Sequence, residues 1–379
     1  MLVGDKMKIG IITWFEYENY GTKLQAVALQ CKLRRFGHEA YLLNFYPKSN
    51  KIQRPFLSKV GNRILRTVKE SRMKNVYQKY NDDLEKKKFL MQRFITDRCL
   101  LTDRLNDDTE YIAICNSMDL LIFGSDQIWN PVDFHPYYYG KFDSIKTPKI
   151  SYAPSFGTSK LDDSIVSEYE QALSSFAYIT VREDVGVNII RNQLGLKAIR
   201  VVDPTMLLSD REWMEYLSIE KSSDNYTICY LLGDNYNHFK EAKRFSDAHN
   251  TRLVVLHGSE ISFKADGQIV ASAGPKEFVQ MISGAQYVIT DSFHALVFSL
   301  LFEKDFFVFY RFQGDGLTNE NSRITQIIEE FNIPNRLVNY DGIIPLNVEK
   351  LRYSGINKHM EDVRNESEKI LYGLINDYI

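Results

Sequence analysis

A histidine follows a strongly apolar strand in the second half of the chain, where it opens a helix. The segment Val288–Thr290 predicts the strand, Asp291 and Ser292 lie at its end, and His294 falls in the first helical turn. A helix N-terminus and a serine hydroxyl together form a phosphate pocket, and histidine exchanges a proton near neutral pH. We therefore predict an anion-binding, proton-transferring site here. The competing interpretation is a histidine satisfied in the core, with Asp291 or Ser292 only capping the helix.

An arginine occupies the same kind of position in the first half. Arg182 directly follows the strand predicted for residues 178–181, and Glu183 comes next. A guanidinium at a strand end can grip a carboxylate or a phosphate with two parallel hydrogen bonds. A purely structural pair with Glu183 is the alternative. Asp203 lies at the end of another predicted strand, but Asp before Pro is also a common turn, so its contact with a ligand stays open.

A polar segment with a tryptophan follows the strand predicted for residues 120–123. Hydrogen-bonding groups beside an aromatic face are typical of a sugar-binding surface. The loop at residues 151–157 ends a neighbouring strand and is expected to line the same cleft. Alternatively, Ser125 or Asp126 caps a helix and the tryptophan lies in the core. The residues that we predict to form the sugar-binding surface are Ser125, Gln127, Trp129 and Ser155.

A glycine turn, Asn19–Thr22, lies between the first predicted strand and helix. Backbone N–H groups at such a junction favour an anion, which makes Gly21 a candidate binding position. The chain has neither a GxGxxG nor a GxxxxGK[ST] sequence, so no dinucleotide or Walker phosphate loop is predicted. A tight turn that needs glycine explains Gly21 equally well.

The elements that position these residues alternate between short β-rich runs and amphipathic stretches, which is the pattern of parallel sheets covered by helices. We predict a strand at 8–13, a helix at 22–36 and a strand at 40–45, followed by strands at 120–123, 150–152, 178–181 and 199–202. After a polar boundary at 220–225 the rhythm restarts, with strands at 227–232, 253–256, 287–290 and 306–309, and helices at 239–249, 275–283 and 293–302. The fold class is therefore α/β, with two Rossmann-like domains facing a cleft. The predicted domains are 7–220 and 225–360, with a C-terminal helix at 361–379 that packs back on the first.

Residues 51–104 interrupt this rhythm with 15 Lys or Arg against 6 Asp or Glu. The apolar positions recur at helical spacing, which predicts one or two basic amphipathic helices. A solvated helical face is one interpretation, and contact with an anionic membrane surface is the other. The apolar positions are Leu57, Val60, Ile64, Val68, Met73, Val76, Tyr80 and Leu84.

The composition excludes some classes of protein. In 379 residues, 47 Lys or Arg nearly balance 49 Asp or Glu, and without a stacking aromatic motif we predict no nucleic-acid partner. Four scattered cysteines, Cys31, Cys99, Cys115 and Cys229, predict free thiols, and the absence of ligand spacing predicts no metal. No apolar run is long enough to span a bilayer, and Met1–Lys6 lacks the apolar region of a signal peptide, so a cytoplasmic location is expected.

Taken together, these segments resemble the polysaccharide pyruvyl transferase family over roughly residues 7–330. The matching segments, in chain order, are Asn19–Gly21 with Leu24–Ala26, Gly124–Asn130, Ser151–Gly157, Val181–Asp184, Val202–Thr205, Gly274–Phe278, Thr290–His294 and Asn321–Ile324. The resemblance implies a glycosyltransferase-B-like pair of domains. It also implies that phosphoenolpyruvate is the co-substrate, that no cofactor is needed, and that a pyruvate ketal on a sugar is the product.

The resemblance also carries over individual roles. Arg182 and His294 become donor-binding candidates, with Gly21 and Ser292 beside them. Many members have an arginine two positions before the histidine and a glycine after it, where this chain has Ser292 and Ala295. We expect Arg323 or Lys276 to replace that arginine.

Ketal formation requires protonation of the donor's methylene carbon and deprotonation of two sugar hydroxyls. His294 would bind phosphate or shuttle the proton, and the candidate acid or base carboxylates are Asp126, Glu183 and Asp291. Asn19, Tyr20, Ser125, Gln127, Trp129 and Ser155 would contact the acceptor. That acceptor is a surface polysaccharide or its lipid-diphosphate-linked precursor, reached at the inner face of the cell membrane.

Two other functions fit the same two-domain cleft. One is a glycosyltransferase that uses a nucleotide-sugar donor, and the other is a non-catalytic glycan-assembly protein, which the missing arginine favours. The sequence does not identify the acceptor sugar, the hydroxyl pair, the ketal stereochemistry, the carrier of the acceptor or the oligomeric state.

Overall fold

The computed structural model describes residues 6–45, 59–220, 222–313 and 321–378, without the side chains of residues 59–77 and 133. The first half contains a parallel four-stranded sheet in the order β2-β1-β3-β4. Its strands are β1 (Lys8–Ile12), β2 (Glu39–Leu42), β3 (Leu120–Phe123) and β4 (Lys149–Ser151). All residues of β3 and β4 are buried, which explains why β3 reads as an unbroken apolar run.

A bridge between Ile150 and Tyr178 extends this sheet toward a short parallel pair, β5 (Thr180–Val181) and β6 (Ile199–Arg200). The helices of this half are α1 (Tyr20–Arg35), α2 (Lys59–Arg98), α3 (Asp108–Asn116), α4 (Asp163–Leu173), α5 (Asp184–Asn188) and α6 (Asp210–Leu217). The carboxyl ends of β1, β3, β4 and β5 therefore lie along one edge of the first half.

The second half contains a parallel sheet in the order β9-β8-β7-β10-β11-β12. Its strands are β7 (Tyr226–Tyr230), β8 (Arg252–Leu256), β9 (Gln268–Val270), β10 (Tyr287–Thr290), β11 (Asp305–Phe309) and β12 (Leu337–Val338). Its helices are α7 (Tyr236–Ala248), α8 (Pro275–Gly284), α9 (Phe293–Leu301) and α10 (Asn321–Glu330). The chain winds outward in both directions from β7, as in a Rossmann fold, so β7 and β10 border the switch point where ligands bind.

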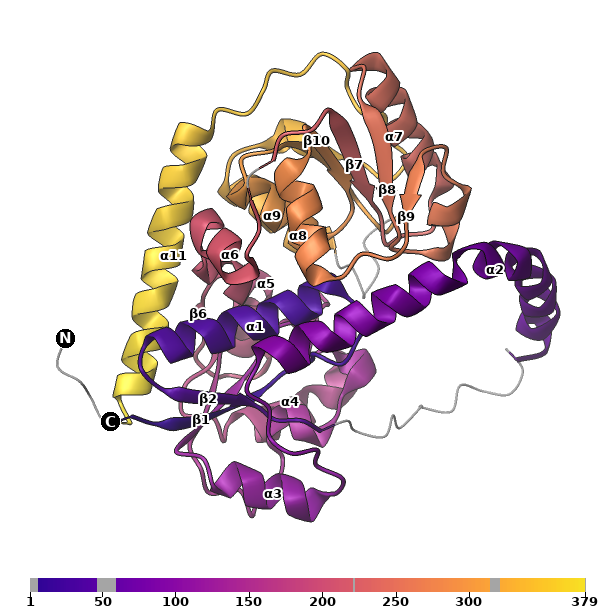
Figure 1. Ribbon diagram of the computed structural model, residues 1–379. Coiled ribbons are helices and arrows are strands. Elements are labelled where there is room, and N and C mark those ends of the chain that lie inside the picture. The colour runs from indigo at the N-terminus through magenta and orange to yellow at the C-terminus, as the bar shows by residue number, and fades with distance from the viewer. Residues whose placement is uncertain (1–5, 46–58, 221, 314–320, 379) are drawn as a thin grey trace.

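The two halves share one buried apolar cluster that includes Leu24 of α1 and Leu296 of α9. Tyr20 opens α1 and stacks on Phe278 of α8, with ring centroids 4.7 Å apart. Its hydroxyl donates to the carbonyl of Ala273 at 3.0 Å. Figure 1 shows α1 lying between the first-half sheet and helices α8 and α9. Because α1 carries Gly21 in its first turn, this packing brings a predicted site position against the second half.

The C-terminal helix α11 (Tyr353–Asn376) begins earlier than the predicted residue 361. It runs along both halves and ends beside the first-half sheet (Figure 1). Glu368 accepts from Lys32 of α1 at 3.0 Å, and Tyr372 meets Phe36 edge to face at 5.3 Å. Ser367 also accepts from the backbone N–H of Val202, so α11 supports the loop that carries Asp203.

The basic segment forms a single helix, α2, whose C-terminal part reaches the second half. The Nζ of Lys87 donates to the carbonyl of His257 at 3.0 Å, and Tyr80 stacks on Phe263. Leu57 lies outside the described residues, as do the side chains of Val60, Ile64, Val68, Met73 and Val76. The predicted membrane contact of this segment therefore stays a prediction.

The predicted strands and helices occur, with ends displaced by a few residues. Short elements were not predicted, among them β9, β12, α3 and α10. Among the described residues the four cysteines are free, no helix has the length and apolar character to cross a bilayer, and no group of three or more His, Cys, Asp or Glu side chains could hold a metal ion.

Candidate functional site

The carboxylate of Asp203 is the point at which the two halves converge. Its Oδ2 accepts from Nη1 of Arg182 at 2.7 Å and lies 3.7 Å from Nε2 of His294. The hydroxyl of Ser125 donates to the same oxygen at 3.3 Å. The other carboxylate oxygen of Asp203, Oδ1, accepts from the N–H and the hydroxyl of Thr205, at 2.9 and 2.6 Å. The structure thus gathers Arg182, Ser125 and His294, which are far apart in sequence, around one acid.

Asp203 is fully buried, and burial alone would raise its pKa. Attraction to His294 and Arg182, together with the hydrogen bond from Thr205, outweighs burial and holds the pKa well below its usual range. The distance from Nε2 of His294 to Oδ2 exceeds a normal hydrogen bond, so we attribute the low pKa to charge attraction and to the Thr205 and Arg182 contacts. Asp203 is therefore a fixed negative charge that faces both Arg182 and His294.

Arg182 is 3% exposed and held on three sides. Its Nε donates to Glu183 at 2.9 Å, Nη1 donates to Asp203, and the guanidinium lies 4.6 Å from the ring centroid of Phe293. Burial would lower its pKa, but Glu183, Asp203 and Asp126 raise it above the usual value. Its Nη2 has no hydrogen-bond partner within the described part of the chain. The structural pair with Glu183 is confirmed, and the N–H groups of Nη2 remain for a ligand.

A small cavity adjoins Arg182. It measures about 10 Å³, and its lining includes Asp203, Phe293, Arg323 and Gln326. This is about enough for a single water molecule. A donor larger than water would enter this cavity only if side chains or the two halves moved.

His294 is 7% exposed and lies in the first turn of α9 against α1. A β-carbon placed on Gly21 would lie 1.9 Å from its Nδ1. Gly21 is part of the helix α1, so the prediction of a tight turn is wrong, and the close approach of the imidazole requires the glycine instead. Across the described residues, Nε2 has no hydrogen-bond partner at normal distance.

The residues before His294 have structural partners. Ser292 caps α9, with its hydroxyl accepting from the N–H of Ala295 at 3.4 Å. Asp291 is fully buried, and its two oxygens accept from the N–H groups of Leu232 and Gly233, each at 2.8 Å. This carboxylate thus joins the ends of β7 and β10, and its role as an acid or base stays a prediction.

Asp126 lies near Arg182. Its backbone has a left-handed conformation, with φ of 61°. Its Oδ2 accepts from the hydroxyl of Thr22 at 2.5 Å, and its Oδ1 accepts from the N–H of Gln127. Ser125 is fully buried and donates both to Asp203 and to the carbonyl of Ala153. Asp126 keeps its carboxylate beside Arg182, whereas Ser125 does not reach an open surface.

Two predicted acceptor contacts are wrong. Trp129 is fully buried in the first-half core, where its Nε1 donates to the carbonyl of Tyr138 at 3.2 Å. Tyr20 is 1% exposed and packs between the halves. Neither ring offers a face to a sugar.

The other side chains that we predicted to contact the acceptor form hydrogen bonds with nearby protein groups. Asn19 caps α1 by accepting from the N–H of Thr22 at 3.3 Å. Ser155 is 1% exposed and accepts from the N–H of Gly157. Gln127 is half-buried, and with its amide oriented to match its neighbours, its oxygen accepts from both terminal nitrogens of Arg323 at 3.0 Å.

The two predicted replacements for the family arginine differ in position. Arg323 on α10 is 7% exposed, meets Gln127 across the halves, and lines the small cavity with Arg182. Lys276 lies in the first turn of α8, half-buried. Among the described residues, no hydrogen bond or ion pair joins Lys276 to the cluster around Asp203. Arg323 is thus the candidate that the structure brings to the site.

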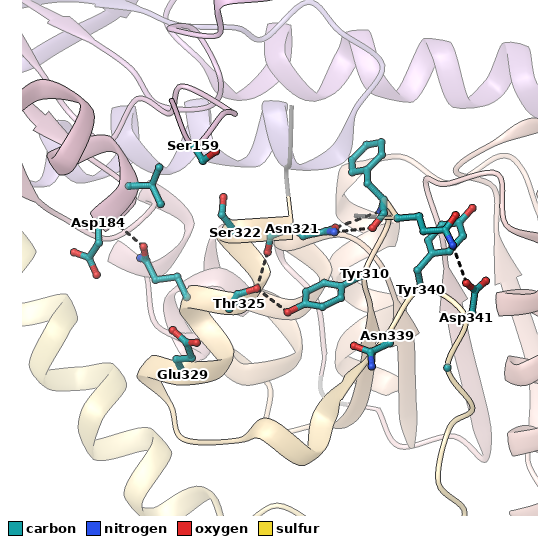
Figure 2. Close-up of a pocket in the computed structure, with 15 residues that line it drawn as sticks. Ser159, Asp184, Tyr310, Asn321, Ser322, Thr325, Glu329, Asn339, Tyr340 and Asp341 are labelled. Atoms are coloured by element: carbon teal, nitrogen blue, oxygen red, sulfur yellow. Dashed lines mark hydrogen bonds between the residues drawn. The ribbon is translucent and has the colours of Figure 1, made fainter. Parts of the chain in front are cut away.

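A larger cleft adjoins this cluster (Figure 2). The sequence predicted a cleft between the two domains but not the residues that line this one. Its volume is about 990 Å³, and Gln326 lines both the cleft and the small cavity. The lining comes from four separate segments, at 159, 184–185, 310–329 and 339–342, with residues 314–320 outside the description. The resemblance to the family included two segments that contribute to this lining, Val181–Asp184 and Asn321–Ile324.

Comparisons with known structures place the fold among glycosyltransferase-B enzymes and epimerases. An Arabidopsis thaliana protein complexed with UDP-L-rhamnose is 10% identical, with a TM-score of 0.55 and 99% of each chain covered. The UDP-GlcNAc 2-epimerase of Methanocaldococcus jannaschii is also 10% identical, with a TM-score of 0.52, covering 98% of this chain and 100% of its own. A Polygonum tinctorium UDP-glucosyltransferase is 9% identical, with a TM-score of 0.51 and 99% of each chain covered. The predicted pair of Rossmann-like domains is confirmed.

A search among curated proteins found no match. The family model described as polysaccharide pyruvyl transferase matches residues 19–311, a span that includes Gly21, Arg182, Asp203 and His294. This chain belongs to the polysaccharide pyruvyl transferase family.

Proposed function

We propose that this protein transfers a pyruvyl group from phosphoenolpyruvate to two hydroxyls of a sugar, forming a ketal and releasing phosphate. The observation that carries the proposal is the convergence of Arg182 and His294, from opposite halves, on Oδ2 of Asp203. A cation that is fixed by buried carboxylates and a histidine beside it are the groups that an anionic enol phosphate and its protonation require.

Arg182 would bind the donor through Nη2. Glu183, Asp203 and the ring of Phe293 hold the guanidinium in place, so a ligand does not have to order a long flexible side chain. Arg323 lines the same small cavity and supplies a second positive charge for the phosphate or the carboxylate. Because the cavity holds about one water, donor binding would be coupled to a separation of the halves or of these side chains.

His294 would donate a proton to the methylene carbon of the donor, which leaves positive charge at C2. The carboxylate of Asp203 lies 3.7 Å from Nε2, so it faces the nitrogen that would carry this proton. The first sugar hydroxyl then adds to C2 and gives up its proton to a base, for which we propose Asp126, whose carboxylate acts on the charge of Arg182 without a hydrogen bond to it.

The second hydroxyl adds as the bond from C2 to the phosphate oxygen breaks. One of the two hydroxyl protons replaces the proton that the methyl group has taken, and the other leaves with the phosphate. Glu183 acts as a positioning residue here, because its carboxylate holds the Nε of Arg182.

The test is incubation with phosphoenolpyruvate and a panel of glycans, free and lipid-diphosphate-linked, with phosphate release and product mass measured together. The expected result is phosphate release matched by a mass gain of pyruvate minus water. A gain of one hexose from a nucleotide sugar would establish a glycosyltransferase instead. Sugar binding without turnover of any donor would establish a non-catalytic protein.

A further inference from the structure

The 990 Å³ cleft lies between the halves, and its lining chemistry differs from that of the cluster around Asp203. Its size matches the range of about 300–1,000 Å³ that is typical of small-molecule sites. In Figure 2, Tyr310, Tyr340, Asn339 and Asp341 border it from the ends of β11 and β12, and Asp184 faces them from the first half.

The lining residues combine aromatic rings, amides and acids. Phe312 is 40% exposed, and Tyr310 and Tyr340 add partly buried rings. Asp184, Glu329 and Asp341 are exposed carboxylates, and the described lining contains neither lysine nor arginine. Rings that cover the apolar face of a pyranose, with amides and carboxylates that accept from hydroxyls, are suited to a sugar. Glu329 and Asp341 would repel a phosphate or a uronic acid, whereas Arg200, 3.4 Å away, offsets the charge of Asp184.

Hydrogen bonds hold this lining in place before any ligand binds. The amide of Asn321 accepts from the N–H groups of Arg311 and Phe312 and donates to the carbonyl of Phe312. The hydroxyls of Tyr310 and Thr325 lie 3.0 Å apart, and Gln313 donates to Asp341 at 3.1 Å. Since the backbone that carries Phe312 is fixed in this way, binding costs little conformational entropy.

A single side chain separates the cleft from the cluster around Asp203. The Oε1 of Gln326 accepts from the N–H of Asp184 at 2.8 Å, and its Nε2 donates to the carbonyl of Arg182 at 3.4 Å. Gln326 lines both cavities, so a ligand in the cleft lies beside the arginine of the donor centre.

We propose that this cleft binds the acceptor as an uncharged sugar, with one face of the ring on Phe312. The carboxylates of Asp184, Glu329 and Asp341 accept from its hydroxyls, and the charges of Glu329 and Asp341 exclude anionic sugars. The assignment of the cleft as the acceptor site rests on the proposed function. The inference that the cleft binds an uncharged sugar does not. In this proposal Phe312 is the aromatic contact of the sugar, in place of the buried Trp129 and Tyr20.

The experiment measures sugar binding without a donor, by saturation-transfer NMR with methyl glycosides of a neutral hexose, an N-acetylhexosamine and a hexuronic acid, and with UDP as a further probe. We expect the neutral glycosides to bind and Phe312→Ala to weaken them about tenfold. Phe89→Ala is the matched control, because Phe89 is an exposed ring on α2, away from the cleft, and should leave binding unchanged.

A second comparison tests the charge. Glu329→Lys should lower the preference for neutral over uronic glycosides at least several-fold, and Asp362→Lys on the exposed side of α11 should not. Unchanged binding by Phe312→Ala, preferred binding of the hexuronide or of UDP, or no transfer to any glycoside would overturn the proposal.

The two proposals fail separately. If pyruvyl transfer occurs but Phe312→Ala leaves the acceptor KM unchanged, the cleft is not the acceptor site, and the proposed reaction stands. If glycosides bind in a manner that depends on Phe312 while no pyruvyl transfer occurs, the sugar site stands and the reaction does not.

Discussion

His294 and Gly21 pack so closely that a β-carbon on Gly21 would lie 1.9 Å from Nδ1 of the imidazole. The two residues lie in the first turns of α9 and α1, which belong to opposite halves. Any side chain on Gly21 must therefore displace the histidine from Asp203 or separate the helices.

Gly21→Ala should reduce pyruvyl transfer at least a hundredfold, because the imidazole cannot keep its position beside Asp203. The measurement is phosphate release from phosphoenolpyruvate in the presence of acceptor. Gly373→Ala is the matched control, since a β-carbon there meets no atom within 4 Å. It should keep full activity and gain up to about 1 kcal/mol of stability from helix propensity. Full activity in Gly21→Ala would show that the close contact has no role.

Asp203→Asn should destabilise the fold by about 3–5 kcal/mol at pH 7, because Arg182 would lose a buried ionised partner. In the folded protein the pKa of Asp203 lies below its unfolded value of about 3.9, so the carboxylate stabilises fully above that pH. This contribution is lost as the pH falls below about 3.9 toward the folded pKa. Urea titrations from pH 7 to pH 3 should show a steeper acid loss in the wild type than in the variant, and equal slopes would contradict the account.

Lys87 predicts a rise of stability with pH as well, but in the alkaline range. Burial lowers its pKa to about 8, against the attraction of Glu18. Between this value and the unfolded pKa of about 10.4 the unfolded chain binds more protons, so the free energy of unfolding rises with pH by up to about 3 kcal/mol.

Lys87→Met should lack this rise when its urea titrations from pH 7 to pH 10.5 are compared with those of the wild type. The neighbouring Lys88 is exposed, so Lys88→Met serves as the control and should retain it. A parallel pH profile for all three proteins would contradict the burial of a charged amine between the halves.

Arg200 and Glu330 form a two-bond ion pair between β6 and α10, at 2.9 and 2.7 Å. Because Arg200 is about one-third exposed, solvent screens the pair, and we expect a coupling of about 1 kcal/mol in a double-mutant cycle of Arg200→Ala and Glu330→Ala. The coupling should shrink in 1 M salt. Additive effects of the two substitutions would show that the pair does not join the halves.

Much of the fold follows from local patterns in the sequence. The apolar run Leu120–Phe123 and the strand Tyr287–Thr290 were predicted with their observed bounds, because a strand buried on both faces has an unbroken apolar signal. β9 and β12 escaped prediction because they are short edge strands, and Gln268 of β9 is exposed. The sequence predicted one or two basic helices in the segment 51–104, and the structure describes one, α2.

The site was predictable only in part. Strand ends identified Arg182 and His294, but Asp203 looked like an ordinary Asp-Pro turn until the fold placed it between them. Trp129 shows the converse limit, because a tryptophan within a polar segment reads as a binding surface although its ring is in the core. The cleft around Phe312 combines four distant segments, and no local pattern could show their proximity.

The most direct test of the central claim compares His294→Ala and Arg182→Lys with the wild type and with Gly373→Ala. The measurement is kcat/KM for phosphoenolpyruvate from phosphate release, with product mass recorded and folding checked by thermal unfolding. We predict losses of about 10²–10⁴-fold for His294→Ala and of at least about 10²-fold for Arg182→Lys in folded protein, while Gly373→Ala keeps the wild-type rate. Full ketal formation by a folded His294→Ala protein would contradict the claim that His294 and Arg182 act together at one donor site.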